Sequence, residues 1–365
     1  MSQIKAKDNI VNLQRRYIKR DVATDREYIQ MDRNENPFGY SPGVPIAIEK
    51  AYKRLSRYPD IYAGKLVGKL AAIHRIAGEN IVTGNGLFEL IGVIPQIFLN
   101  PGDEVITSAS SFDWYRIASS IANANVIEVP LGEDYGISLK NIRKAITGKT
   151  RLIWLCNPNN PTGTVIAESE IRELLENISP DILVVLDEAY IDFVREVPPV
   201  NSIGLVKKYG NVALLRTFSK VYGPASFRIG YMIACESVTN AMRNFKTPMS
   251  TNSWAVEAAL ASLEDRDFYR YTLEQTALQL DYFYREFDRL GFPYIRSNAN
   301  FLLVHVLQDS EGVVSVLKNQ GILVRGGREF GFPERLRITV GKEEDNALLI
   351  KILKEYRVQF KLSQG

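Results

Sequence analysis

The sequence is organised around residues 214–231, which read LLRTFSKVYGPASFRIGY. An apolar run typical of a buried strand ends here at Thr217. Ser219, Lys220 and Arg228 follow it. Hydroxyl groups and a guanidinium at this spacing can converge on one phosphate group, the guanidinium through a forked pair of charge-assisted hydrogen bonds. Burial and neighbouring positive charge favour a partly deprotonated amine on Lys220, as a Schiff-base lysine requires. Taken alone, a Ser-Lys pair is more often a surface feature of a polar loop.

A reactive lysine beside a phosphate site suggests pyridoxal phosphate, and residues 183–190, LVVLDEAY, fit that cofactor. They read as a buried parallel strand that ends on a carboxylate, and open α/β sheets bind ligands at the carboxyl ends of their strands. An ionised Asp187 there can keep a pyridine nitrogen protonated, which makes the ring an electron sink. Tyr190 is placed to bond the phenolic oxygen of the ring. The alternative for Asp187 is a helix cap just after the strand.

A third stretch, residues 154–164, reads WLCNPNNPTGT and is again a strand followed by a turn-rich segment. Asn160 precedes Pro161 and is therefore held extended. Its side-chain amide can donate to the same phenolic oxygen. The alternative is a loop without a role in binding.

Together these stretches resemble the fold-type I pyridoxal-phosphate enzymes, and specifically the class I and II aminotransferases of the histidinol-phosphate aminotransferase type. The resemblance extends from residues 34–37, NENP, to residues 336–341, LRITVG. It implies an α/β fold with a large domain, built on a mostly parallel seven-stranded sheet, and a small α+β domain. The alternation of strand-like runs with helical segments favours the same sheet.

The resemblance also predicts the domain organisation. We expect an N-terminal arm (residues 1–33), a large cofactor-binding domain (34–260) and a small domain (261–365) that includes part of the N-terminal segment. One long helix, from Trp254 to about Leu290, is expected to link the two domains.

Further cofactor contacts are implied by the resemblance. Gly86, Leu87 and Phe88 begin a helix whose free N–H groups suit a phosphate, although relatives usually have small or acidic residues at the last two positions. Phe112 falls where the family stacks an aromatic ring on the pyridine ring. Tyr58 matches a tyrosine that reaches the cofactor phosphate of the neighbouring subunit, which predicts a homodimer.

The substrate contacts follow in the same way. Arg337 matches the arginine that clamps the α-carboxylate of an amino-acid substrate, because its planar fork fits a carboxylate. Asn34 and Glu35 lie along the substrate entrance in the family. Asp113 is an unexpected acid beside the pyridine ring, where it would attract a cationic side chain or, alternatively, cap the following helix.

These motifs predict catalysis by Lys220, Asp187 and Tyr190. In transamination the freed Lys220 removes the Cα proton of the substrate and returns it to the cofactor. An alternative is oxygen-dependent oxidation of a cationic amino acid such as L-arginine. That alternative is suggested by the departures from the family pattern at Leu87, Phe88, Asp113, Pro224, Ser226, Gly326 and Gly327. A binding protein that retains the cofactor without catalysis is disfavoured, because the catalytic residue types are all present.

Composition excludes several other classes of protein. The chain has 365 residues, a formal net charge of +3 and 45% hydrophobic residues, so nucleic-acid binding is not indicated. Only two histidines are present, which argues against a metal site, and no run of about 18 apolar residues predicts a membrane span. Cys156 and Cys235 both lie in apolar runs, so we expect buried thiols and a cytoplasmic protein.

Overall fold

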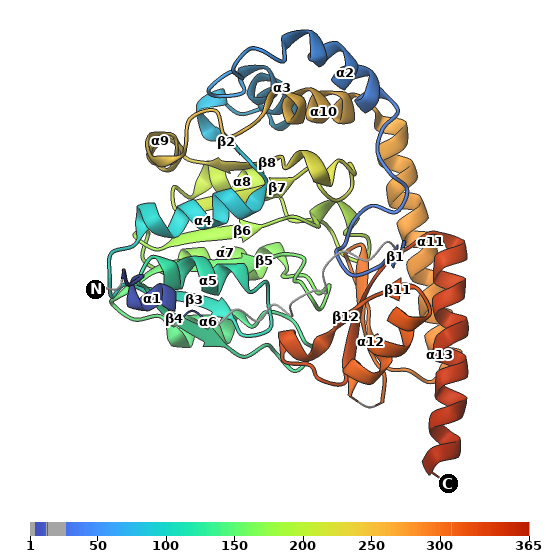
Figure 1. Ribbon diagram of the computed structural model, residues 1–365. Coiled ribbons are helices and arrows are strands. Elements are labelled where there is room, and N and C mark those ends of the chain that lie inside the picture. Colours follow the sequence, from blue (N-terminus) through green and yellow to red (C-terminus); the bar gives the residue numbers. More distant parts are fainter. Residues whose placement is uncertain (1–3, 12, 14–26, 308, 365) are drawn as a thin grey trace.

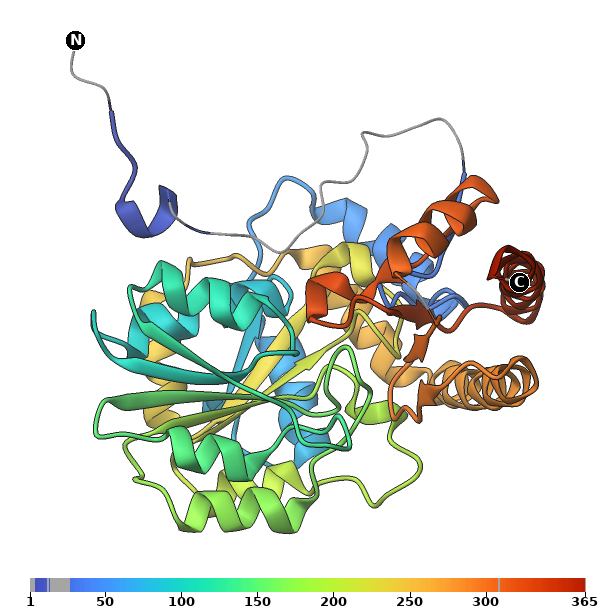
Figure 2. The same cartoon turned by 90° about the horizontal axis from the view of Figure 1, so that it is seen from below.

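The computed structural model describes residues 4–11, 13, 27–307 and 309–364, with side chains up to residue 358. Its largest element is a sheet with helices on both faces (Figures 1 and 2). In spatial order the strands of this sheet are β2 (Ile81–Gly84), β8 (Gly230–Ala234), β7 (Val212–Thr217), β6 (Leu183–Asp187), β5 (Thr150–Cys156), β3 (Glu104–Ser108) and β4 (Asn125–Val129). Of these seven strands, β8 alone runs in the opposite direction to the others: it pairs antiparallel with β2 and β7, and the remaining pairs are parallel. The predicted mostly parallel seven-stranded sheet is therefore confirmed.

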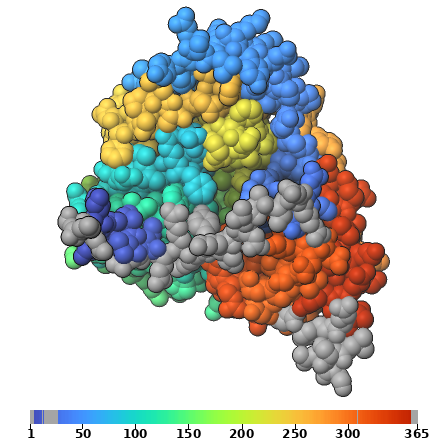
Figure 3. Space-filling model, in the orientation of Figure 1, coloured from blue at the N-terminus to red at the C-terminus, as the bar shows by residue number. Residues whose placement is uncertain are grey.

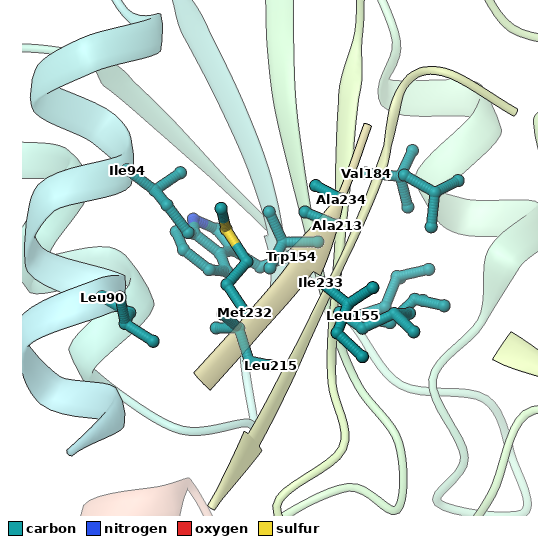
Figure 4. Close-up of a cluster of buried hydrophobic side chains, with 14 of the residues drawn as sticks. Leu90, Ile94, Trp154, Leu155, Val184, Ala213, Leu215, Met232, Ile233 and Ala234 are labelled. Atoms are coloured by element: carbon teal, nitrogen blue, oxygen red, sulfur yellow. The ribbon is translucent and has the colours of Figure 1, made fainter. Parts of the chain in front are cut away.

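The central strands are apolar along their length because both faces of the sheet are covered. Trp154, Leu155 and Val184 are each at most 1% exposed. In Figure 4, Trp154 lies on the side of the sheet that faces α4 (Leu87–Phe98), whereas Leu155 and Val184 lie on the opposite side. In this register Cys156 lies opposite Asp187, which in turn lies opposite Leu215, so the carboxyl ends of β5, β6 and β7 meet at one edge.

Helices α4 and α5 (Trp114–Ile121) cover one face of the sheet, and α7 (Glu168–Glu176) and α8 (Ser202–Lys208) cover the other (Figure 2). The remaining helices around the large sheet are α2 (Gly43–Ala51), α3 (Gly64–His74), α6 (Leu139–Ala145), α9 (Glu236–Phe245) and α10 (Ser253–Glu264). Helix α2 packs against α10 at the top of Figure 1.

A second hydrophobic core lies under a smaller antiparallel sheet and includes Phe283, Leu302 and Ile338. The strands of this sheet, in spatial order, are β12 (Arg325–Gly326), β13 (Arg335–Thr339), β10 (Phe301–His305) and β9 (Tyr294–Ile295). It is accompanied by α11 (Arg266–Leu290), α12 (Ser310–Asn319) and α13 (Glu343–Gln364). Near the N-terminus, β1 (Ile29–Gln30) pairs in parallel with β11 (Ile322–Leu323). The domain limits at residues 33 and 260 stay a prediction.

The expected helix from Trp254 to Leu290 is wrong in one respect, because it is divided at Asp265 into α10 and α11. Asp265 has φ −89° and ψ 83°, which is not helical. Its carboxylate instead accepts the backbone N–H of Phe268 at 2.8 Å and the hydroxyl of Ser41 at 2.6 Å. Asp265 therefore caps the start of α11, and a new helix axis begins there.

Two other expectations concern single regions of the chain. Cys156 is buried as predicted, but Cys235 is half-buried, because it stands at the N-cap of α9 rather than inside the preceding strand. Of the expected N-terminal arm, residues 1–3, 12 and 14–26 lie outside the described residues. The described part includes a short helix, α1 (Asp8–Val11).

Among the described residues, no helix combines the length and the apolar character that crossing a membrane requires. The same part of the chain contains no group of three or more His, Cys, Asp or Glu side chains arranged to hold a metal ion.

The core of the large sheet predicts the effect of one substitution. Leu155→Ala removes a side chain that is 0% exposed, so we expect the free energy of unfolding to fall by about 2–5 kcal/mol through lost burial and cavity formation. Leu278→Ala, at a position 58% exposed on α11, serves as the control and should change it by less than about 0.5 kcal/mol. Urea-induced unfolding followed by circular dichroism measures both, and equal shifts would contradict the packing described here.

Candidate active site

A cavity of about 1130 Å³ opens where the carboxyl ends of β5, β6 and β7 meet the smaller sheet. Most of the residues that the sequence singled out line it: Asn34, Glu35, Leu87, Phe88, Phe112, Asp113, Asn160, Asp187, Tyr190, Thr217, Ser219, Lys220, Arg228 and Arg337. Gly86 and Tyr58 are not among the lining residues. The fold therefore brings together side chains that are separated by up to 303 positions in the sequence, from Asn34 to Arg337.

Lys220 lies in the middle of this set. Its Nζ donates to the backbone carbonyl of Arg33 at 3.0 Å and to that of Asn34 at 2.9 Å. Burial lowers the pKa of Lys220 to about 7 from its usual 10.5, and the nearby guanidinium of Arg337 contributes in the same direction. The amine is thus poised to lose its proton near neutral pH, as a nucleophile or a general base requires.

Asn34 holds several parts of the cavity together. Its side-chain N–H₂ donates to the hydroxyl of Tyr190 at 3.0 Å, and its Oδ1 accepts the hydroxyl of Thr339 at 3.1 Å. The carbonyl that accepts Lys220 also accepts Nδ2 of Asn300 at 3.1 Å. Because Asn34 is 1% exposed and these groups are engaged within the protein, it is suited to positioning its neighbours.

Asp187 is buried at the end of β6. Its Oδ2 accepts the hydroxyl of Tyr115 at 2.7 Å, and its Oδ1 accepts the backbone N–H of Ala189 at 3.0 Å. Burial raises the pKa of Asp187 to about 6. A cationic ring nitrogen beside it would favour the ionised form.

Tyr115 is a site residue that the sequence reasoning missed. Its ring stacks on Trp154 at a centroid distance of 4.9 Å and an interplanar angle of 10°, and it also touches Phe112 edge-on at 5.5 Å. A signal for it was present, since Tyr115 follows Phe112 by three positions, and in the turn that leads into α5 its backbone N–H donates to the carbonyl of Phe112 at 3.2 Å.

A cradle for an anion lies between the start of α4 and Arg228. Gly86 has φ +71°, and a Cβ atom there would lie 2.2 Å from NH2 of Arg228, so only glycine allows this approach. NH1 of Arg228 donates to the carbonyl of Ala225 at 2.8 Å and to the hydroxyl of Ser219 at 3.5 Å. Among the described residues, no carboxylate forms an ion pair with Arg228.

A guanidinium facing the positive end of a helix dipole is unfavourable unless an anion lies between them. The cradle therefore fits the phosphate of pyridoxal phosphate. Lys220 and Asp187 lie in the same cavity and suit its carbonyl and its ring nitrogen.

Arg337 is buried on β13, between the rings of Phe301 and Phe330, whose centroids lie 5.6 and 5.3 Å from its Cζ. Its NH1 donates to Oδ1 of Asn160 at 2.7 Å, and its NH2 donates to the carbonyl of Asp32 at 2.6 Å. Its Nε is buried and has no hydrogen-bond partner in the described part of the chain. Asn160 therefore links Arg337 to the loop after β5.

Asp113 lines the cavity, but its carboxylate is engaged by Arg116. Nε of Arg116 lies 2.8 Å from Oδ1 of Asp113, and NH2 lies 3.1 Å from Oδ2. Asp113 makes no side-chain capping bond at the start of α5, so the capping alternative is not seen. The negative charge that was expected to attract a cationic substrate is thus already compensated.

Tyr58 lies outside the cavity of its own chain and is 89% exposed. It borders a hollow of about 910 Å³ between α2 and α10. The structure of one chain therefore leaves Tyr58 free to contact another molecule.

Comparisons with known proteins agree with this geometry. Residues 26–353 match the family model described as aminotransferase class I and II. The chain is 37% identical over 338 residues to a histidinol-phosphate aminotransferase of Caldicellulosiruptor saccharolyticus, covering 93% of this chain and 94% of the relative. It is 39% identical over 324 residues to histidinol-phosphate aminotransferase 2 of Carboxydothermus hydrogenoformans, covering 88% and 89%.

Among solved structures, the fold is similar to that of histidinol-phosphate aminotransferase from Sinorhizobium meliloti in complex with pyridoxal 5′-phosphate. The TM-score is 0.90 at 24% identity, with 98% of this chain and 99% of that chain covered. The match to the family model and the identity to its members, each over most of the chain, lead to one conclusion. The chain belongs to the class I and II aminotransferase family.

Proposed function

We propose that this chain uses pyridoxal phosphate to transfer the α-amino group of an amino-acid-like substrate to a keto acid. The observation that carries the proposal is the position of Lys220. Its amine, with a pKa near 7, shares one cavity with the anion cradle at Arg228 and the buried carboxylate of Asp187. These are the groups that a transaminating lysine needs around it.

The chemistry of each residue suggests its role in holding the cofactor. Arg228, the hydroxyls of Thr217 and Ser219 and the N–H groups of Leu87 and Phe88 would hold the phosphate. Asp187 would face the ring nitrogen and keep it protonated, with Tyr115 holding the carboxylate in place. When bound, the cofactor supplies a carbonyl for the substrate amine and a ring that accepts the electron pair released at Cα.

The proton transfers fall to Lys220. Its neutral Nζ would take the proton from the substrate Cα and hold it for return when the cofactor is bound. The carbonyls of Arg33 and Asn34 accept the N–H groups of Lys220 and so fix the direction in which its lone pair points. Tyr190 and Asn160 would bond the phenolic oxygen of the ring.

At the substrate end, Arg337 is the proposed clamp for an anionic group, because its Nε has no hydrogen-bond partner among the residues that the structure describes. Glu35 lines the same cavity. The oxidase alternative has less support, because Asp113 is compensated by Arg116 and the relatives compared above are named as aminotransferases.

A dimer is proposed from the surface around Tyr58. Seven large apolar or aromatic side chains between residues 40 and 62 are exposed by half or more: Tyr40, Ile46, Tyr52, Leu55, Tyr58, Ile61 and Tyr62. This segment forms the upper, blue surface of Figure 3. Exposed apolar groups gathered on one segment are typical of a contact with another protein chain.

Lys220→Ala tests the central assignment. The variant should lose the yellow absorbance of a lysine-bound cofactor and lose transamination by several orders of magnitude, because it has neither the amine nor the base. Lys207→Ala, an exposed lysine on α8, should retain both. Absorption spectra of the two proteins after addition of pyridoxal phosphate decide the matter. Retention of the yellow band by Lys220→Ala would refute the assignment.

The lowered pKa of Lys220 predicts how its reactivity depends on pH. Only the neutral amine attacks a carbonyl, so labelling of Lys220 in the cofactor-free protein should rise through pH about 7 and level off above it. Borohydride trapping of added pyridoxal phosphate, followed by mass spectrometry of the Lys220 peptide, measures this. The peptide of the exposed Lys140 provides the reference, and parallel pH profiles would contradict the prediction.

The dimer has its own test. Sedimentation velocity at micromolar concentration should give the mass of two chains. Leu55→Asp combined with Ile61→Asp should shift the protein towards monomer and weaken cofactor binding, because Tyr58 of each chain would leave the other's site. Leu278→Asp, on the exposed face of α11, should leave the dimer intact. If the wild type is a monomer, the prediction that Tyr58 reaches the cofactor of another chain is wrong.

A further inference from the structure

The turn between β12 and β13 directs an acidic side chain into the cavity. It contains Gly326 and Gly327, and a Cβ atom on Gly327 would lie 2.3 Å from the carbonyl oxygen of Phe332 and 2.5 Å from that of Arg335. Glycine is therefore required for the tight 3-10 turn over residues 327–330. This turn places Glu329 among the residues that line the cavity.

Glu329 is bound to Arg325 through both of its oxygens. Nε of Arg325 donates to Oε1, and NH2 donates to Oε2 at 2.8 Å. The side chain of Glu329 is 6% exposed, and that of Arg325 is 23% exposed. A bidentate pair with so little access to water is more persistent than a surface ion pair.

Arg325 and Arg337 lie directly opposite each other on β12 and β13. Like charges at opposed positions of a sheet repel, so this pair needs negative charge nearby. Glu329 and the buried Asp32 line the cavity with them. Both carboxylates act electrostatically on Arg337, and Asp32 is influenced by both arginines. Glu329 thus offsets part of the positive charge of this arginine pair before any substrate binds.

We propose that Glu329 determines the substrate class: the anionic group held at Arg337 is a carboxylate, and phosphate monoesters are rejected. The inference rests on the proposed aminotransferase function and extends it. It sets this chain apart from the relatives named for histidinol phosphate, whose name denotes a phosphate-bearing substrate.

The reason is the amount of positive charge that remains available to an anionic ligand. A phosphate monoester carries a charge of about −1.5 to −2 at pH 7, and it is best held by more than one cation. Here the fork of Arg325 already faces Glu329, which leaves Arg337 to face the ligand. A carboxylate brings one charge to that guanidinium. A phosphate would bring about two, close to the carboxylate of Glu329, and would be repelled.

L-Histidine and L-histidinol phosphate form a matched pair for the test, because they share the amine and the imidazole and differ in the anionic group. The full-length holoenzyme is mixed with each compound, and with each of the common L-amino acids, and the loss of yellow absorbance is followed. Rate constants and apparent affinities of the half-reaction are obtained by stopped flow for the wild type, Glu329→Gln, Glu329→Ala and Glu334→Gln. Glu334 is exposed and pairs with His305, so its variant controls for the loss of one acidic charge near β13.

The wild type should react with an α-amino acid at least about 10-fold more efficiently than with L-histidinol phosphate. Glu329→Gln should improve the apparent affinity for L-histidinol phosphate by about 10- to 100-fold with little change in its maximal rate, and should improve that for amino acids by a clearly smaller factor, because a carboxylate carries less negative charge. Glu329→Ala should act in the same direction and covers the case in which the Gln variant fails to fold, whereas Glu334→Gln should match the wild type.

Two other outcomes are distinguishable. A wild type that reacts with L-histidinol phosphate as well as with its best amino acid, or Glu329 variants that leave the selectivity unchanged, would overturn the inference while the aminotransferase function stands. A holoenzyme that reacts with no amine at all would overturn the proposed function itself.

Discussion

The contact between Lys220 and the backbone at Arg33 and Asn34 is the interaction on which the cavity depends. Lys220 comes from the loop after β7 of the large sheet, whereas Asn34 belongs to the segment after β1. Asn34 is itself joined through Thr339 to the smaller sheet and through Tyr190 to the loop after β6. The buried Asn34 thus connects the large sheet and the smaller sheet to the amine of Lys220. A shift of either sheet would therefore move Lys220.

Burial acts in opposite directions on the two principal ionisable groups of the cavity. It disfavours the charged form of each, so the pKa of Lys220 falls to about 7 while that of Asp187 rises to about 6. The two values approach each other near neutral pH, where small changes in nearby charge alter the protonation of both. A bound anion at Arg228 and a cationic ring at Asp187 are changes of that kind. Ligand binding is therefore expected to change the protonation of Lys220 and Asp187.

Close backbone approaches explain residues that look unremarkable in the sequence. Gly86 allows Arg228 to lie against the start of α4, and Gly327 allows the turn that carries Glu329 into the cavity. In both cases the glycine contributes no chemical group. Because glycine has no side chain, it leaves space for a group of another residue: the guanidinium of Arg228 at Gly86, and backbone carbonyls at Gly327.

The sequence by itself determined the family, the mostly parallel sheet and the set of residues around Lys220, because these depend on local patterns. Apolar runs that end in Asp187 or Thr217 identify strand ends, and strand ends of a parallel sheet meet at one edge. Only the tertiary structure decided the hydrogen bond from Tyr115 to Asp187 and the break at Asp265. These depend on which side chains meet in space, and sequence spacing does not contain that information. The pairing of Asp113 with Arg116 has the local spacing i, i+3, but the structure was needed to show that this pair forms at the edge of the cavity. The pairing of Glu329 with Arg325 is of the same kind, since it required a turn whose geometry is set by contacts with Phe332 and Arg335.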